Sequence, residues 1–194
     1  VWQFHSVPQP GEFGNDTWAG DSWKSRSGTN TWGLFTIDEK RGILYMPLGS
    51  AQNDYYGIDR PGNNLFANSI VAVDAETGKL KWHFQEVPDD IWDFDSSYEV
   101  LLMDREIRGR MRQILVHMNK SGLTFVLDRV TGQFIGSFNV PEERNWITGV
   151  TEDGKLVGRL EPPVNKTTHL CPSAAGGKSW NSMSYSPKTG MLYI

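Results

Sequence analysis

Acidic side chains crowd the segment 89–95, which reads Asp-Asp-Ile-Trp-Asp-Phe-Asp. Four carboxylates within seven residues are ordinary for a solvated loop, but three large apolar side chains interleave with them and indicate that part of the loop is anchored. In an extended chain, Asp93 and Asp95 point to the same side. Two close carboxylates either hold a hard cation or share a proton. This pair is therefore a candidate for cation binding or proton transfer.

Two other segments carry candidate functional residues. Lys120 lies in a His-Met-Asn-Lys-Ser-Gly stretch directly before an apolar run. A lone lysine beside glycine is most often a solvated turn residue, so by itself it indicates little.

The segment 47–66 is rich in Gly, Asn and aromatic residues. Loops of this length are usually functional or disordered. The aromatic residues favour order, which suits a cover over a substrate or cofactor.

Internal repeats indicate the elements that must position these residues. The segment 1–8 recurs as 81–88, an offset of 80, and 73–80 recurs as 127–134, an offset of 54. A Trp placed ten residues before a Gly-x-Leu-Tyr stretch occurs twice, 148 residues apart. These offsets fit units of roughly 50 residues, one of them with an insertion. Short strands repeated at about this period, with an aromatic signature, are typical of propeller blades.

The local patterns agree with blades. Segments 35–47, 69–84 and 123–138 each read as two β-rich runs joined by a tight turn that contains Gly. We find no long run with helical periodicity. We therefore predict an all-β fold and a partial β-propeller of about four blades, with residues 1–194 forming part of one domain. The chain begins at Val1 and ends in an apolar run, and we interpret it as an internal fragment of a longer protein.

The eight tryptophans divide into two groups. Most of them, including Trp2 and Trp82, are expected to pack one blade against the next, because a large flat ring fills the wedge between sheets. Trp32 and Trp180 each follow a stretch rich in Gly, Ser or Lys at the start of a strand. At that position a ring can face the central channel.

Composition excludes several function classes. Lys and Arg number 19 against 23 Asp and Glu, so the net charge of −4 argues against a nucleic-acid partner, which needs a basic face. The single cysteine, Cys171, excludes an intrachain disulfide framework. No apolar run reaches the length of about 18 residues that a membrane span needs.

The motifs together resemble the quinoprotein alcohol dehydrogenases, which use pyrroloquinoline quinone (PQQ) and include methanol, ethanol and membrane glucose dehydrogenases. Four motifs carry the resemblance: Asp74-x-x-Thr-Gly-Lys-x-x-Trp82, Ile91-Trp-Asp-Phe-Asp95, Lys120-Ser-Gly-x-x-Phe-Val-Leu-Asp-Arg129, and Trp180-Asn-x-Met-Ser-Tyr-Ser-Pro187. The resemblance covers essentially the whole chain. It implies an eight-bladed propeller with PQQ and a divalent metal near its axis, of which this chain supplies about four blades.

The resemblance also implies roles for individual residues. Asp93 matches the general base, which takes the alcohol proton as hydride moves to the quinone carbon. Lys120 falls where the family has a lysine or arginine that donates to the quinone oxygens. Trp32 matches the tryptophan that stacks on the PQQ ring. Trp180 belongs to a second cofactor motif, in which Ser179 replaces the usual Asn.

The implied metal ligands are Asp93, Asp95 and Ser50. Ser50 stands eighteen residues after Trp32, where alcohol-oxidising members have Asn. Serine is a weaker ligand, so either Gln52 or Asn53 compensates or the metal is held differently. A glutamate ligand of the family would precede residue 1. Asp95 resembles the extra aspartate of lanthanide-using members, so we expect calcium, with a lanthanide as the alternative.

The expected function is oxidation of an alcohol, polyol or sugar hydroxyl to a carbonyl, in the periplasm, with cytochrome c or a membrane quinone as electron acceptor. We expect these residues alone to be inactive. One alternative is a non-catalytic PQQ-like propeller scaffold, which would not need Asp93, Lys120 and Trp32 together. A propeller glycosidase using Asp93 with another acid is a further alternative, but it has no positive motif.

Overall fold

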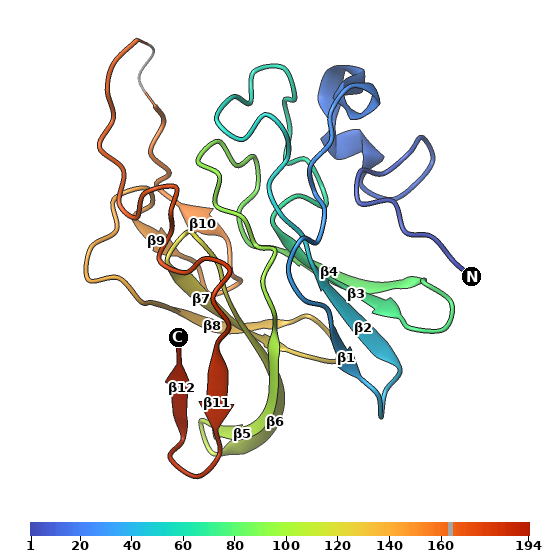
Figure 1. Ribbon diagram of the computed structural model, residues 1–194, viewed down its shortest axis with the longest axis vertical. Coiled ribbons are helices and arrows are strands. Elements are labelled where there is room, and N and C mark those ends of the chain that lie inside the picture. Colours follow the sequence, from blue (N-terminus) through green and yellow to red (C-terminus); the bar gives the residue numbers. More distant parts are fainter. Residues whose placement is uncertain (163–164) are drawn as a thin grey trace.

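Two four-stranded antiparallel sheets dominate the computed structural model, which describes residues 1–162 and 165–194 (Figure 1). The strands of the first sheet are β1 (Thr36–Asp38), β2 (Ile43–Pro47), β3 (Ser69–Asp74) and β4 (Leu80–Gln85). Those of the second are β5 (Leu101–Ile107), β6 (Arg110–Met118), β7 (Leu123–Asp128) and β8 (Phe134–Asn139). Within each sheet the strands pair in chain order. The predicted all-β class and the three predicted hairpins are confirmed.

The remaining elements are short. They are two 3₁₀ segments and two hairpins: Asn15–Thr17, Ala19–Lys24, β9 (Gly149–Val150) with β10 (Leu156–Val157), and β11 (Ser184–Ser186) with β12 (Met191–Tyr193). Of the four units predicted from the sequence, two are thus complete four-stranded blades. Among the described residues, no helix is long and apolar enough to cross a membrane.

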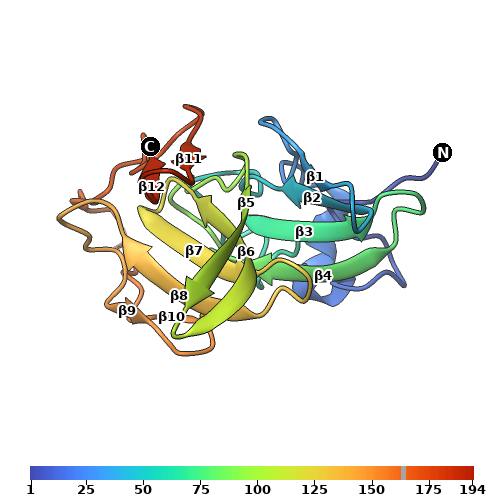
Figure 2. The ribbon, with the colours of Figure 1, turned by 90° about the horizontal axis from the view of Figure 1, so that it is seen from below.

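The two blades stand side by side and share one apolar core (Figure 2). Buried side chains of the first sheet, such as Tyr45 and Trp82, meet Leu115 and Leu127 of the second. The Tyr45 hydroxyl also donates a hydrogen bond of 2.8 Å to the carbonyl of Arg129, in the turn between β7 and β8 of the second sheet. Burial of this apolar area stabilises the relative placement of the two sheets.

A repeated turn explains the sequence offsets of 80 and 54. In the turn after β3, the Asp74 carboxylate accepts hydrogen bonds from the Thr77 amide at 3.0 Å and the Thr77 hydroxyl at 2.9 Å. The next residue, Gly78, has a φ of +70°, and a Cβ there would lie 2.4 Å from the Trp2 ring. Only glycine tolerates both constraints. The turn after β7 repeats this arrangement.

In that second turn, a Cβ on Gly132 would lie 2.6 Å from the ring of Trp82, which belongs to the preceding blade. Each of these tryptophans therefore packs flat against the glycine of the following turn. The interblade packing predicted for Trp82 is confirmed, and Trp2 makes the corresponding contact with the turn of the first blade from a segment that forms no strand. The position equivalent to Trp82 in the second blade is Gly136, 54 residues further on.

Strand direction decides where the functional segments meet. Because antiparallel strands alternate, the connections that follow β2, β4 and β6 all leave the same end of the two sheets. These connections are residues 48–68, 86–100 and 119–122, and Figure 1 shows the long loops gathered at that end. The fold therefore brings the acidic segment 89–95, Lys120 and the aromatic segment 47–66 to one place.

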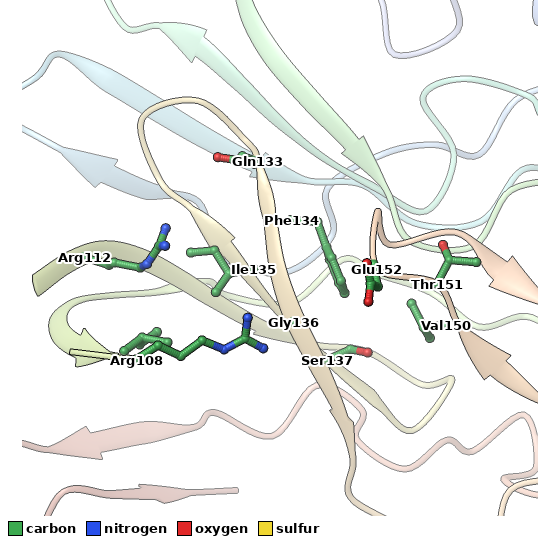
Figure 3. Close-up of a pocket in the computed structure, with 11 residues that line it drawn as sticks. Arg108, Arg112, Gln133, Phe134, Ile135, Gly136, Ser137, Val150, Thr151 and Glu152 are labelled. Carbon is green, nitrogen blue, oxygen red and sulfur yellow. The ribbon is translucent and has the colours of Figure 1, made fainter. Parts of the chain in front are cut away.

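A separate pocket of about 460 Å³ lies beside β8, away from this end, and is lined by Arg108, Arg112, Gly136 and Glu152 among others (Figure 3). None of the candidate site residues lines it.

Candidate active site

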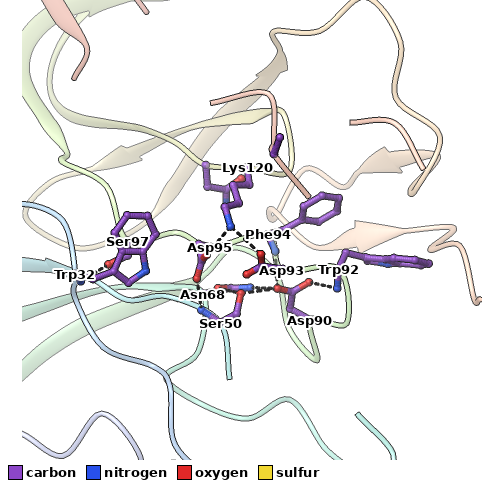
Figure 4. A network of polar contacts seen from close by, with 12 residues as sticks. Trp32, Ser50, Asn68, Asp90, Trp92, Asp93, Phe94, Asp95, Ser97 and Lys120 are labelled. Atoms are coloured by element: carbon purple, nitrogen blue, oxygen red, sulfur yellow. Dashed lines mark hydrogen bonds and ion pairs between the residues drawn. The ribbon is translucent and has the colours of Figure 1, made fainter. Parts of the chain in front are cut away.

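Lys120 joins the two predicted carboxylates. Its Nζ donates to Asp95 Oδ2 at 2.7 Å and to Asp93 Oδ2 at 2.9 Å (Figure 4). Asp95 and Lys120 are nearly buried, with exposed fractions of 8% and 9%. Charge-assisted hydrogen bonds of this length in a poorly hydrated site are strong. The lysine that the sequence left ambiguous is therefore held against the acidic pair.

The buried Asp90 carboxylate holds the acidic loop by hydrogen bonds. This carboxylate is 1% exposed. One of its oxygens accepts hydrogen bonds from Ser50 Oγ (2.7 Å), Asn68 Nδ2 (2.8 Å) and the Phe94 amide (2.8 Å), and the other accepts from the Trp92 amide (2.9 Å). Burial raises the pKa of Asp90, and these donors oppose the rise. The loop is thereby folded back on its own carboxylate instead of running extended.

Asp93 sits at the bend of that loop. Its φ is +59°, a conformation that Asp tolerates better than most residues. Burial raises the pKa of Asp93 to about 6; the Lys120 hydrogen bond lowers it, and the neighbouring charge of Asp95 raises it. Burial alone would lower the pKa of Lys120, but its hydrogen bonds to Asp95 and Asp93 raise it overall. A carboxylate with a pKa near 6 is well suited to accept a proton near neutral pH.

The tryptophan predicted to stack on a cofactor lies beside the acidic pair. A Cβ on Gly49 would lie 2.7 Å from Asp95 Oδ1 and 3.2 Å from the Trp32 indole nitrogen, so both side chains meet over the Gly49 backbone. The Trp32 amide donates to Ser97 Oγ at 2.8 Å. Its ring meets Tyr98 edge-on, with centroids 5.2 Å apart.

Trp32 and Trp180 share one pocket of about 330 Å³, whose other lining residues are Gly33, Leu34, Tyr98 and Glu99. Both indoles are accessible, with exposed fractions of 43% and 73%. Ser179 is half-buried next to Trp180, and its carbonyl accepts a hydrogen bond of 3.1 Å from Lys178 Nζ. The structure thus brings the predicted cofactor tryptophans together from segments far apart in the chain.

A family model described as the β-propeller domain of PQQ-dependent glucose, ethanol and alcohol dehydrogenases matches residues 1–145. The chain belongs to this family.

Among relatives of this PQQ propeller family, a quinohemoprotein alcohol dehydrogenase from Comamonas testosteroni is 35% identical over all of this chain and 29% of its own length. A lanthanide-dependent methanol dehydrogenase from Methylorubrum extorquens is 34% identical over 92% of this chain and 31% of its own. The chain therefore spans about a third of the length of these relatives.

Solved structures confirm the partial propeller. A quinohemoprotein alcohol dehydrogenase from Pseudomonas putida superimposes with a TM-score of 0.91 and 30% identity, covering all of this chain and 31% of that one. A europium-containing methanol dehydrogenase gives a TM-score of 0.84 and 31% identity, covering 97% and 33%.

Ser50 stands where alcohol-oxidising members of the family have Asn, and it hydrogen-bonds to both Asp90 and Asp95. Its backbone amide donates to Asp95 Oδ1 at 2.9 Å, while its hydroxyl donates to Asp90. In the described part of the chain, neither Gln52 nor Asn53 hydrogen-bonds to the acidic pair: the Gln52 side chain accepts a hydrogen bond from Ser27, and the Asn53 carbonyl accepts one from Arg60. Within residues 1–162 and 165–194, no group of three His, Cys, Asp or Glu side chains has the arrangement of a metal site.

Several contributors to the site carried no sequence signal of their own. Asp90 lay inside the acidic segment but was indistinguishable from its neighbours. Tyr55, in the aromatic segment, donates to Asp93 Oδ2 at 3.2 Å. Arg60 is fully buried and donates to Asn64 Oδ1 at 2.7 Å and to the Asp90 carbonyl. An arginine inside a long loop rich in Gly and Asn was the available hint.

Proposed function

We propose that this chain supplies the base, the cationic donor and the aromatic walls of a PQQ- and metal-dependent dehydrogenase that oxidises the hydroxyl of an alcohol, polyol or sugar to a carbonyl. The observation that carries the proposal is Lys120, which joins Asp93 to Asp95 beside Trp32. A scaffold propeller has no use for a half-buried base with a raised pKa next to an open aromatic pocket. The alcohol and methanol dehydrogenases among the relatives support the same reaction class.

The pocket fits a planar aromatic cofactor. Trp32 and Trp180 offer exposed ring surfaces beside the buried Tyr98, and a flat conjugated ligand stacks on such surfaces. Trp32 and Trp180 would hold the ring system, with Ser179 beside them and Lys120 near its oxygens. PQQ, when bound, would supply the two-electron acceptor for the hydride that leaves the alcohol carbon.

The protein residues then have separate tasks. Asp93, in its deprotonated form, accepts the hydroxyl proton at a carboxylate oxygen. Lys120 carries a positive charge beside the acidic pair before a metal binds, and once displaced by the metal it can donate hydrogen bonds to negative charge that develops nearby. Tyr55 donates to Asp93 and restricts its orientation.

The charge balance of the cluster suits a hard cation. Burial raises the pKa of Asp54, and the negative charges of Asp95 and Asp90 raise it further, so Asp54 also belongs to the acidic surroundings. These acids and Asp93 outnumber the positive charges of Lys120 and a single buried arginine. Oxygen ligands with excess negative charge select Ca²⁺ or a lanthanide ion. Asp93, Asp95 and Ser50 would hold the metal, which requires the Lys120 ammonium to move from between the acids.

Reconstitution of the full-length protein tests the proposal. PQQ is added with Ca²⁺ or La³⁺, and dye-linked oxidation of alcohols, polyols and sugars is measured. Asp93→Asn should abolish turnover, whereas Glu106→Gln, an exposed acid on β5, should leave it unchanged. Unchanged turnover in Asp93→Asn would refute the base assignment. No turnover with either metal would favour the scaffold alternative, and activity with calcium alone would remove the lanthanide proposal.

The electron acceptor and compartment follow as proposals from the family resemblance. We place the reaction in the periplasm, with cytochrome c or a membrane quinone taking the electrons. Reduction of each acceptor by the reconstituted protein distinguishes them.

A further inference from the structure

Trp146 is a fully buried indole in the segment that follows β8. It lies one residue beyond the stretch that the family model matches. It is not a blade-packing tryptophan, because its ring does not cover the glycine of a Thr-Gly turn. It packs in an apolar cluster that includes Leu123 and Phe125 of β7, and from there it reaches two functional segments.

The first contact is with the turn that carries Lys120. Trp146 Nε1 donates a hydrogen bond of 3.0 Å to the carbonyl oxygen of Ser121, the residue directly after Lys120. The same turn is held from another side, because the Gly177 amide donates to the Lys120 carbonyl at 2.9 Å. A Cβ on Gly176 would lie 2.6 Å from Lys120 Cα, so the backbone there packs directly on the lysine.

The second contact is with the acidic loop. The Trp146 ring packs against Phe94 with centroids 4.9 Å apart and planes inclined by 59°. Phe94 stands between Asp93 and Asp95 in the chain and is itself fully buried. One rigid side chain with only two rotatable bonds therefore touches both the loop of the base and the turn of the lysine.

We propose that Trp146 is a positioning residue that fixes the Lys120 turn relative to the Asp93 loop. Lys120 itself is a flexible side chain and cannot hold the two backbones in register. Two other contacts link the segments: Asn119 Nδ2 donates to Ser96 Oγ at 2.8 Å, and the Lys120 amide donates a longer hydrogen bond of 3.3 Å to the Asp95 carbonyl. Neither contact involves the ring of Phe94. The catalytic consequence rests on the proposed function; the positional claim does not.

The test uses the cofactor-free full-length protein and the reactivity of Lys120. Trp146→Phe keeps an aromatic ring against Phe94 but removes the hydrogen bond to Ser121. Loss of a buried hydrogen bond of ordinary strength should raise the labelling rate of Lys120 by an amine-reactive acetylating reagent about fivefold at fixed pH, as measured by peptide mass spectrometry. Trp82→Phe is the matched control, because Trp82 is also buried but its indole nitrogen has no hydrogen-bond partner in the described part of the chain.

Two outcomes overturn the proposal: folded Trp146→Phe labels Lys120 at the wild-type rate, or Trp82→Phe raises the rate equally. If Trp146→Phe does not fold, Phe94→Leu removes the ring contact from the other side and should raise labelling in the same way. Because labelling needs neither PQQ nor substrate, its result is independent of whether the proposed reaction is found.

In the reconstituted enzyme, Trp146→Phe should lower kcat per active site severalfold with little change in KM, because the misplaced pair affects the proton transfer more than binding. A purely structural role would reduce the number of active sites and leave kcat per site at the wild-type value. That result would overturn the catalytic part of the proposal.

Discussion

Burial has a larger effect on the pKa of the Asp93 carboxylate than its ionic partner Lys120 has. Burial raises its pKa to about 6, and Lys120 limits the rise. The base is protonated below this value and free above it. We therefore expect the Asp93 carboxyl of the metal- and cofactor-free full-length protein to titrate with a pKa of about 6. An infrared titration of the carboxyl band from pH 4.5 to 8.5, compared with Asp93→Asn, measures this, and a pKa near the ordinary value of about 4 would contradict the effect of burial.

Asp90 serves the fold of the loop and not the reaction itself. It accepts four hydrogen bonds in a site that is 1% exposed. Asp90→Asn introduces an NH₂ group that must face at least one of these donors, which leaves buried groups unpaired. We expect a loss of about 2 kcal/mol in the free energy of unfolding. Urea denaturation measures it.

The matched control for this change is Asp153→Asn, which alters a carboxylate that is exposed in the turn between β9 and β10. Its effect should lie within about 0.5 kcal/mol. Similar losses in the two variants would show that the buried network does not stabilise the loop.

The Thr-Gly turns and the tryptophans that pack on them fix the position of one blade relative to the next. Gly132 combines a φ of +75° with a Trp82 ring 2.6 Å from where a Cβ would be. Gly109, in the turn between β5 and β6, has nearly the same φ of +74°, but no described atom lies within 4 Å of its Cβ position. Gly109→Ala therefore carries only the backbone cost of about 1 kcal/mol.

Gly132→Ala must in addition displace the indole. We expect it to lower the free energy of unfolding by about 1–3 kcal/mol more than Gly109→Ala, as measured by urea denaturation of the two variants. Equal losses would mean that the ring moves away without cost, and that the tryptophan contact does not fix the blades.

At this scale the sequence was informative wherever a local pattern repeats. The hairpins and the packing of Trp2 and Trp82 were predictable, because turn chemistry and an aromatic at a fixed spacing are both local. The extended conformation expected for Asp93 and Asp95 was wrong: the carboxylate of Asp90 folds the loop back, with Asp93 at a φ of +59°. Asp90 also needs Ser50, and Trp146 needs Ser121, partners more than twenty residues away that no spacing rule indicates.

At the scale of the whole molecule, the end of the propeller that carries the loops concentrates negative charge in a chain whose net charge is only −4. Folding brings Asp54, Asp90, Asp93 and Asp95 near one lysine, and this crowding opposes folding until a cation offsets it. A cation that binds only the folded state must therefore stabilise the protein in proportion to its affinity.

We expect Ca²⁺ or La³⁺, added to the cofactor-free full-length protein at about 100 times its dissociation constant, to increase the free energy of unfolding by about 2.7 kcal/mol. Thermal unfolding at several metal concentrations measures the effect. Asp95→Asn removes one proposed ligand and should greatly reduce it, whereas Glu106→Gln, an exposed acid on β5 remote from the loops, should not. If neither ion raised Tm, or if Asp95→Asn responded like Glu106→Gln, the acidic cluster would be neutralised by Lys120 alone and the metal would have to bind through other residues.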